Sequence, residues 1–350
     1  MQCKVKSLAV LVAVVRIATG LLVSICAGAQ QSAQQSAQHS AQLSNQPGGP
    51  TSTYPHRAIQ LVVPYTPGTT ADTLARVLGA KLAERWKVAV VTDNKAGATG
   101  IIANEYVARA TPDGYTLLFT ATAHGTVPAL KPKLSYDAVR GFTPISLLGT
   151  SAMALVVAPQ SGFGNTRELL EASRKQPGRL HYSSTGNGGP QHLTMELLKQ
   201  ELGFDLVHVP YKGAAGAMAD LVAGHVQASV ASLQTAAPFI QSGKLKMLAV
   251  LSADRSTAFP DVPTLKETGL GSLIVETWYG VLAPAAMSAE IVNKLNIEFN
   301  SLLQLADVRE HLARQGVVPA GGRPERLGEL IASEISRWTR VVKNAGIKAD

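Results

Sequence analysis

The amino-acid sequence predicts an α/β protein with a largely parallel sheet. Short apolar segments of strand length alternate with longer segments in which apolar residues recur at helical spacing. Several short segments are apolar at consecutive positions, which is typical of parallel strands covered on both faces. The order strand, Val-Pro-Tyr, glycine and helix also occurs twice, in LVVPYTPGTTAD (61–72) and VHVPYKGAAGAMAD (207–220).

The N-terminal segment has the features of an export signal. Lys4 and Lys6 precede an apolar stretch, and Ala27-Gly28-Ala29 is a small-x-small cleavage signal, so residues 1–29 are expected to be a signal peptide. Lipid attachment at Cys26 is the alternative, disfavoured by the large Ile25 before it. Residues 30–53 are low in complexity and uncharged, which predicts a flexible linker. The mature protein is expected in the periplasm.

The composition of residues 54–350 excludes several classes of function. Both cysteines lie in the signal, so neither a disulfide nor a thiolate is expected in the mature chain. Lys4, Lys6 and Arg16 leave with the signal, which lowers the net charge from +8 to +5. No basic run or basic stripe interleaved with aromatic residues is present, so nucleic-acid binding is not expected.

The elements follow from local patterns, beginning with a strand at 59–63 and a helix at 70–86. The further expected strands are a short one ending at 181–182 and those at 88–92, 116–120, 155–158, 206–209, 227–231, 248–251 and 279–283. The further expected helices are at 101–110, 166–176, 190–202, 214–223, 289–305, 306–315 and 324–344. In the helix at 190–202, Pro190 suits the first turn and Gly203 the end.

The turn before that helix, SSTGNGG at 183–189, is polar and rich in glycine. It lacks the lysine of the nucleotide-binding phosphate loop and the third glycine of the dinucleotide fingerprint. Two interpretations fit it. It is a tight turn with capping residues, or its backbone N–H groups and hydroxyls bind an anion at the positive end of the helix dipole.

The turn at 64–72 allows the same two interpretations. Thr69 or Thr70 can cap the helix, and Asp72 suits the first helical turn. Alternatively, Pro67 and Gly68 bring the backbone close to a ligand, and the threonines donate hydrogen bonds to a carboxylate. The charge of Asp72 would then compete with the ligand unless the side chain points away.

No catalytic set is recognisable in the sequence. The patterns H-E-x-x-H and G-x-S-x-G are absent, and the histidines are scattered without the spacing of metal ligands. His192 falls in the first turn of its helix, where a capping or surface role is favoured. No catalytic residue, metal or cofactor is therefore expected.

Taken together, the motifs resemble a known family. They are YPHRAIQLVVPYTPGTTADTLAR, ATPDGYTLL, LSYDAVRGFTPIS, SSTGNGGPQHL, VHVPYKGAAGAMADLVAGHVQ, SGKLKMLAV, FPDVPTLKETGL, ETWYGVLAPA and VVKNAGIKAD. In this order the chain resembles the extracytoplasmic solute receptors of tripartite tricarboxylate transporters, the Bug or TctC-like family. The resemblance implies a periplasmic-binding-protein fold with two α/β domains around a ligand cleft.

With the repeated Val-Pro-Tyr unit, the resemblance predicts where the domains divide. Domain 1 is expected at 54–155 and 277–350 and domain 2 at 156–276, with crossings near Val156 and Trp278-Tyr279. The resemblance also implies that one loop from each domain, 65–71 and 183–191, holds a small carboxylate. The candidate ligand-binding residues are Tyr65, Gly68, Thr69, Thr70, Ser183, Ser184, Thr185, Gly186, Asn187, Gly188 and Gly189.

The chain departs from the family pattern at three places. Thr69 replaces a second glycine, Gly189-Pro190 replaces Thr-Ser, and Ala231-Ser232 replaces an Asp-Asn pair suited to an amino group. A mono- or dicarboxylate without an amino group is therefore expected. The resemblance implies a monomeric receptor that delivers its ligand to membrane transporter subunits. A sensor that feeds a signalling partner, and less so a hydrolase on the same scaffold, are the alternatives.

Overall fold

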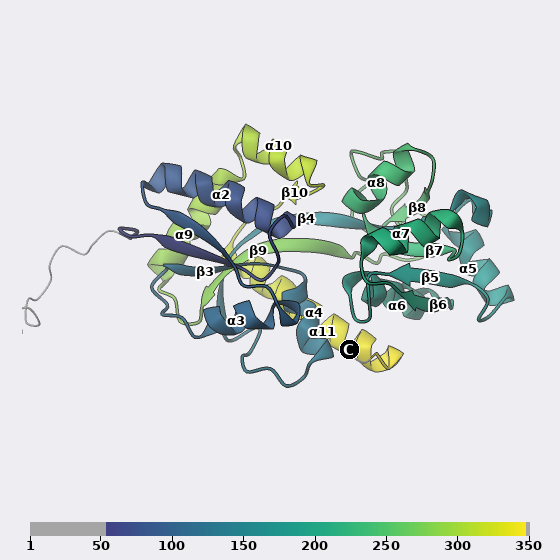
Figure 1. Cartoon of the computed structure of the whole chain (residues 1–350), viewed down its shortest axis with the longest axis horizontal. Helices are drawn as coiled ribbons and strands as arrows, with labels where there is room; N and C mark the ends of the chain where they lie inside the picture. Colours follow the sequence, from purple (N-terminus) through teal and green to yellow (C-terminus); the bar gives the residue numbers. More distant parts are fainter. Residues whose placement is uncertain (1–53, 348–350) are drawn as a thin grey trace, which may run out of the picture. The chain divides into compact units, whose positions relative to one another are not determined.

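The computed structural model describes residues 54–347, which belong to one compact unit (Figure 1). The expected signal peptide at 1–29, the linker at 30–53 and Cys26 lie outside the described residues. Within 54–347, no helix combines the length and apolar character needed to cross a membrane.

The first group of strands forms one part of a mixed sheet. β1 (Ile59–Val63) is parallel to both β2 (Val90–Asn94) and β3 (Thr116–Ala121). β9 (Glu276–Pro284) runs antiparallel to β3 and to the long strand β4 (Phe142–Val157). The order across this part of the sheet is β2-β1-β3-β9-β4.

The second group continues the sheet from the other end of β4, in the order β4-β7-β5-β6. β5 (His181–Ser184) is parallel to β6 (Val207–Pro210) and β7 (Ala228–Ser232), whereas β7 is antiparallel to β4. β8 (Lys246–Val250) pairs with the same end of β4. The short β10, Val318–Pro319, pairs with its middle.

The strand β4 corrects two expectations. Only its last residues were expected as a strand, and the sheet was expected to be largely parallel, but every pairing of β4 and β9 is antiparallel. β4 pairs with β9 up to Ala152 and with β7 from Met153, so one continuous strand joins both groups. Register shifts after Pro144 and Leu147 interrupt the alternation by which a long strand is recognised. The expected domain boundaries stay a prediction.

Most helices begin and end close to the expected residues. They are α2 (Thr70–Trp86), α3 (Ile101–Ala108), α5 (Thr166–Lys175), α6 (Pro190–Leu202), α7 (Ala214–Ala223), α9 (Ala289–Leu302), α10 (Ala306–Arg314) and α11 (Pro324–Ala345). Two helices were missed, α4 (Ala123–Leu130) and α8 (Leu233–Gln241). Each contains a proline, Pro128 or Pro238, which argues against a helix on local grounds. Two short 3-10 helices, η1 (Ala98–Gly100) and η2 (Pro159–Ser161), complete these elements.

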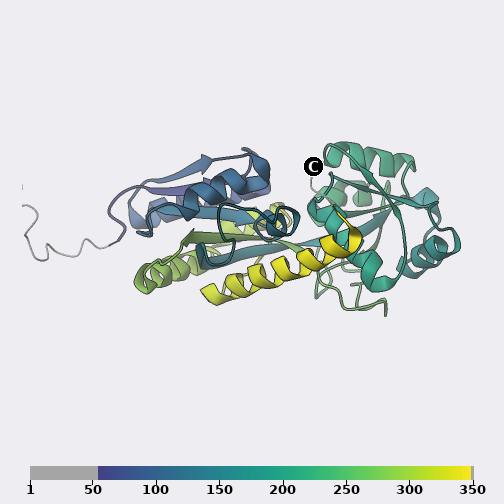
Figure 2. The same cartoon turned by 90° about the horizontal axis from the view of Figure 1, so that it is seen from below.

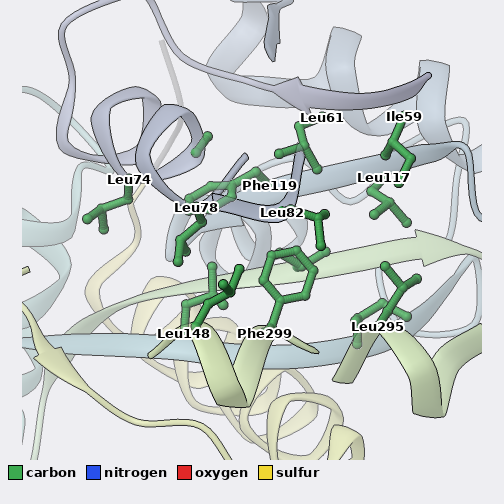
Figure 3. Packing of buried hydrophobic residues seen from close by; sticks show 14 of the residues in the cluster. Ile59, Leu61, Leu74, Leu78, Leu82, Leu117, Phe119, Leu148, Leu295 and Phe299 are labelled. Carbon is green, nitrogen blue, oxygen red and sulfur yellow. The ribbon is translucent and has the colours of Figure 1, made fainter. Parts of the chain in front are cut away.

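The core around β1 and β3 anchors α2. Leu74, Leu78 and Leu82 are fully buried and point toward the strands, beside Phe119 and Phe299 (Figure 3). Each fully buried side chain of this size contributes about 1.5–3 kcal/mol of transfer free energy. This packing fixes α2, and therefore the position of its first residue, Thr70.

A second core anchors α6. Leu193, Leu197 and Leu198 are buried against the strands of the second group, and Gly203 ends the helix in the left-handed conformation, as expected. The C-terminal helix α11 runs alongside β4 and packs against α4 and α6 (Figure 2). Its Trp338 belongs to the same core, so the end of the chain supports the helix that follows the glycine-rich turn.

Candidate functional site

A small pocket lies where β5 and β7 end and α6, α7 and α8 begin. It is lined by Ser184, Thr185, Gln191, Ala214, Ala217, Met218, Ser229, Val230, Ala231, Ser232 and Thr235, with room for about one water molecule. In Figure 1, α6 and α7 flank the strands that end at this place. Ligands of α/β sheets commonly bind beyond the carboxyl ends of strands, so this is a place where a ligand is expected.

The pocket is uncharged and combines hydroxyls with apolar side chains. None of its described lining residues carries a charge, and hydroxyls come from Ser184, Thr185, Ser229, Ser232 and Thr235. The N-cap residues of α6 and α7 are Gly189 and Gly213, which provide no side-chain cap. Helix starts carry backbone N–H groups and a partial positive charge, so an anion is favoured here without a basic side chain.

The hydroxyls of the second loop have different partners. The Ser183 side chain is buried and donates to the Ala217 carbonyl at 3.2 Å, so it points into the protein. The Ser184 hydroxyl lies 2.7 Å from His208 Nε2. Thr185 Oγ1 donates to Gln191 Oε1 at 2.7 Å. Ser184 and Thr185 thus line the pocket, and Ser183 supports it from beneath.

The glycine N–H groups of this loop have partners within the protein. Gly186 N–H donates to Ser184 Oγ at 3.2 Å, Gly188 N–H to His192 Nδ1 at 3.0 Å, and Gly189 N–H to the Gly186 carbonyl at 3.3 Å. Their expected availability to a ligand therefore requires an exchange of partners. Asn187 is exposed at the tip. Gly188 has a φ of 69°, a conformation that glycine adopts without strain.

The first loop is closed by Asp72, which is only 3% exposed. Asp72 accepts hydrogen bonds from Gly68 N–H at 2.9 Å and from the side chains of Arg76 and Asn94. Burial opposes ionisation, but these hydrogen bonds outweigh it and lower the pKa of Asp72. Thr69 caps the helix and donates to the Thr66 carbonyl at 3.0 Å. The charge of Asp72 is therefore satisfied inside the loop.

Thr70 is the first-loop residue that reaches the segment beside the pocket. Its hydroxyl lies 3.2 Å from the side-chain oxygens of both Gln234 and Gln315. Gln234 precedes Thr235, a residue of the pocket wall, in the first turn of α8. Tyr65 is half-buried, and burial raises its pKa, so its phenol stays protonated.

Several residues in or beside the pocket are absent from the candidates expected from the sequence. Gln234 and Thr235 lie on α8, which was not expected, and Gln315 follows α10. Gln191 and Ser229 lie in the expected elements α6 and β7, and Ser232 was singled out only for its departure from the family pattern. The sequence does contain a signal for the start of α8. Ser232 caps this helix by accepting a hydrogen bond from the N–H of Thr235, three residues later. Pro238 within α8 argues against a helix, so the capping signal alone did not predict α8.

The Ser184–His208 contact has the geometry of a nucleophile and its base, but the surroundings are unsuited to catalysis. Burial, with contributions from His192 and Lys199, lowers the pKa of His208 to about 4, which makes it a weak base at neutral pH. Among the described residues, no carboxylate hydrogen-bonds to His208 to orient it, and no three His, Cys, Asp or Glu are grouped to hold a metal.

Comparison with known proteins identifies the family. A model described as the tripartite tricarboxylate transporter family receptor matches residues 74–347. The chain belongs to this receptor family. It is a family of solute-binding receptors and not of enzymes, which decides against the hydrolase. The receptor is 38% identical over 298 residues to the UPF0065 protein in the tcbD-tcbE intergenic region of Pseudomonas sp. strain P51, covering 85% of this chain and 89% of that protein.

Solved structures agree with this assignment. R. palustris Rpa4515 with adipate is 33% identical, with a TM-score of 0.71 over 84% of this receptor and 99% of that chain. MatC of Rhodopseudomonas palustris with bound malate is also 33% identical, with a TM-score of 0.67 over 83% and 100%. The receptor has the α/β fold of periplasmic binding proteins, as expected.

Proposed function

We propose that this receptor captures a small carboxylate in the periplasm and delivers it to the membrane subunits of a tripartite tricarboxylate-type transporter. Export is directed by residues 1–29, and the mature receptor is a monomer. The observation that carries the proposal is the uncharged, hydroxyl-lined pocket at the starts of three helices. Two similar solved structures hold adipate and malate, which are small carboxylates.

A carboxylate complements this pocket chemically. Its oxygens only accept hydrogen bonds, and the hydroxyls of Ser184, Thr185, Ser232 and Thr235 can rotate to donate to it. Each hydrogen bond to a charged group contributes about 1.5–3 kcal/mol. The starts of α6 and α7 add their dipoles. Several modest interactions thus replace a single basic side chain.

The proposed site joins both loops. The second loop, 183–191, contributes Ser184 and Thr185 directly, and the N–H groups of Gly186 and Gly189 when they exchange their protein partners for the ligand. Gly188 contributes by shaping the turn, with its N–H kept on His192. The first loop, 65–71, contributes Thr70, beside Gln234. We assign the two loops to two domains, 54–155 with 277–350 and 156–276, that close on the ligand.

The ligand class follows from the absence of acidic side chains among the described residues that line the pocket. A buried ammonium group needs a carboxylate partner, and none of the described residues of the pocket wall supplies one. At the end of β7 the wall has Ala231 and Ser232, neither of which is charged. A carboxylate without an amino group is therefore preferred over an amino acid.

Binding is tested by a thermal-shift screen followed by calorimetry on the purified protein. Adipate, malate and glutarate form the test set, with glutamate and adipamide as matched controls. A ligand that binds only the folded state raises the melting temperature by mass action. We expect a carboxylate of the set to bind, glutamate to bind more weakly than glutarate, and adipamide not to bind. Binding of adipamide as tight as that of adipate would refute recognition of the carboxylate.

A further inference from the structure

Two histidines form a stacked pair directly beneath the second ligand loop. The rings of His192, in the first turn of α6, and His208, in β6, are 3.8 Å apart between centroids and nearly parallel at 15°. The ring of Tyr182 also stacks on His208, with centroids 4.9 Å apart, and its centroid lies 6.3 Å from that of His192. Neither histidine lines the pocket.

Each imidazole holds one end of the turn that follows β5. His192 Nδ1 accepts the hydrogen bond from Gly188 N–H at 3.0 Å. His208 Nε2 lies 2.7 Å from the hydroxyl of Ser184, a residue of the pocket wall. A nitrogen that accepts an N–H bond carries no proton, so His192 must be unprotonated at Nδ1 to hold Gly188.

The charged groups around the pair come from α6 and the segment after it. Glu196 accepts from the Tyr182 hydroxyl at 2.7 Å and pairs with Lys199 at 2.8 Å, and Lys199 also pairs with Asp205 at 3.0 Å. Burial lowers the pKa of His192, with Glu196 opposing the shift and Lys199 assisting it. Two imidazolium cations in stacking contact would also repel each other.

We propose that His192 and His208 are positioning residues: as a neutral stacked pair they hold the turn from Ser184 to Gly188 in its ligand-binding shape, and uptake of a proton by the pair releases the turn and weakens ligand binding. Protonation of His192 Nδ1 converts the acceptor of the Gly188 N–H into a donor, so that hydrogen bond is lost. The loss moves the segment that carries Ser184 and Thr185. The effect on ligand affinity rests on the proposed function.

The first experiment needs no ligand. Imidazole ¹⁵N shifts of His192 and His208, and the amide shift of Gly188, are recorded by NMR on the parent protein between pH 7.5 and 4. We expect both rings to be neutral at pH 7.5, with His192 unprotonated at Nδ1, and the Gly188 amide to shift as the pair takes up its proton. A charged ring at pH 7.5, or titration that leaves Gly188 unchanged, would overturn the proposal.

The second experiment uses calorimetry with adipate and malate at pH 7.5 and 4.5, with the melting temperature measured at both. His192→Leu and His208→Leu remove the partners of the Gly188 N–H and the Ser184 hydroxyl and should each weaken binding about tenfold at pH 7.5, the equivalent of one lost hydrogen bond. The double variant His192→Asn/His208→Gln keeps a side-chain oxygen at each place but cannot take up the proton.

We expect the double variant to lose less affinity than the parent on acidification, which separates protein titration from protonation of the probe itself. His225→Gln, at an exposed histidine paired with Asp220, is the control and should follow the parent. Equal losses in the parent and the double variant would refute the inference. If neither probe binds the parent, the proposed function loses its support, whereas the NMR titration still decides the role of the histidines.

Discussion

The hydroxyl of Thr70, the first residue of α2, lies 3.2 Å from the side-chain oxygen of Gln234 in the first turn of α8. The two residues are 164 positions apart in the sequence. Their contact brings the start of one helix, fixed by the core around β1, to the helix that carries Thr235 into the pocket wall. The first loop therefore reaches the segment beside the pocket through one threonine.

Replacement of Thr70 is expected to affect binding more than folding. Thr70→Val keeps the shape but removes the hydroxyl, so carboxylate affinity should fall about 3–10-fold, the equivalent of roughly 0.5–1.5 kcal/mol. Thr70→Ser retains the hydroxyl and serves as the matched control. Calorimetry with the carboxylate found in the screen gives the comparison, and equal affinity of the Val and Ser variants would contradict a role for this hydroxyl.

A side chain at Gly188 is expected to destabilise the receptor. With a φ of 69°, a Cβ atom there would lie 2.9 Å from the side-chain carbons of Leu130. Gly178 is the control, because its φ of 72° is similar but its surroundings are open. Gly178→Ala should cost about 1 kcal/mol through backbone strain, and Gly188→Ala about 1–3 kcal/mol more through the displacement of Leu130.

The same pair of variants tests the loop. Gly188→Ala should also weaken carboxylate binding, because the displaced turn carries Thr185, whereas Gly178→Ala should bind like the parent. Urea unfolding measures the stability and calorimetry the affinity. If Gly188→Ala binds as tightly as the parent, the turn acts only as a connection between β5 and α6.

Asp72 is expected to be a major stabiliser of the first loop. In Asp72→Asn one oxygen becomes an NH₂ group, so either Gly68 or Asn94 loses its acceptor and Arg76 loses its counter-ion. The free energy of unfolding should fall by roughly 2–3 kcal/mol. Glu168→Gln is the control: Glu168 also accepts an N–H bond at a helix start, but it is exposed, and its loss should cost about 0.5 kcal/mol or less.

The Asp72 contribution also has a defined pH window. Its folded-state pKa is lowered, so its contribution is present above the usual carboxyl range near pH 3.8 and is lost as the pH falls through the folded value. Urea titrations at pH 7 and pH 3 should therefore show a smaller acid loss in Asp72→Asn than in the parent. An equal loss would mean that Asp72 is not ionised in the folded protein.

His124 is expected to destabilise the receptor in mild acid. It is buried in α4, its Nε2 lies 2.8 Å from the Ala138 carbonyl, and burial lowers its pKa from 6.5 to about 4. Between these values the unfolded chain binds the proton and the folded chain does not, so stability falls as the pH drops from about 6.5 to 4. The maximum loss from this one residue is on the order of 3 kcal/mol.

A variant isolates this effect from the other titrating groups. His124→Gln keeps a donor for the Ala138 carbonyl but has no proton to gain, so it should lose less stability than the parent between pH 7 and pH 4.5. Glu276 and Glu334, whose pKa values are raised by burial, act in the opposite direction in both proteins and cancel in the comparison. Parallel stability curves for the two proteins would contradict a neutral, buried His124.

The elements that carry short-range signals were predictable from the sequence. The helix α2 begins after Thr69, whose side chain caps it, and α6 runs from Pro190 to its end at Gly203, as the residues indicate. The family also followed from local motifs, whereas the ligand-binding role of the two loops stays a prediction. These signals suffice because caps, prolines, glycines and helical periodicity act over a few residues of the chain.

Only the tertiary structure decided the relationships between distant segments. The long strand β4, the proline-containing α8 and the contact of Thr70 with Gln234 have no local signature. The same holds for Asp72, which turned inward onto Arg76 and Asn94, and for His192, which stacked on His208. Sheet pairing, burial and side-chain contacts depend on which surfaces the packed core brings together, and local propensity does not contain that information.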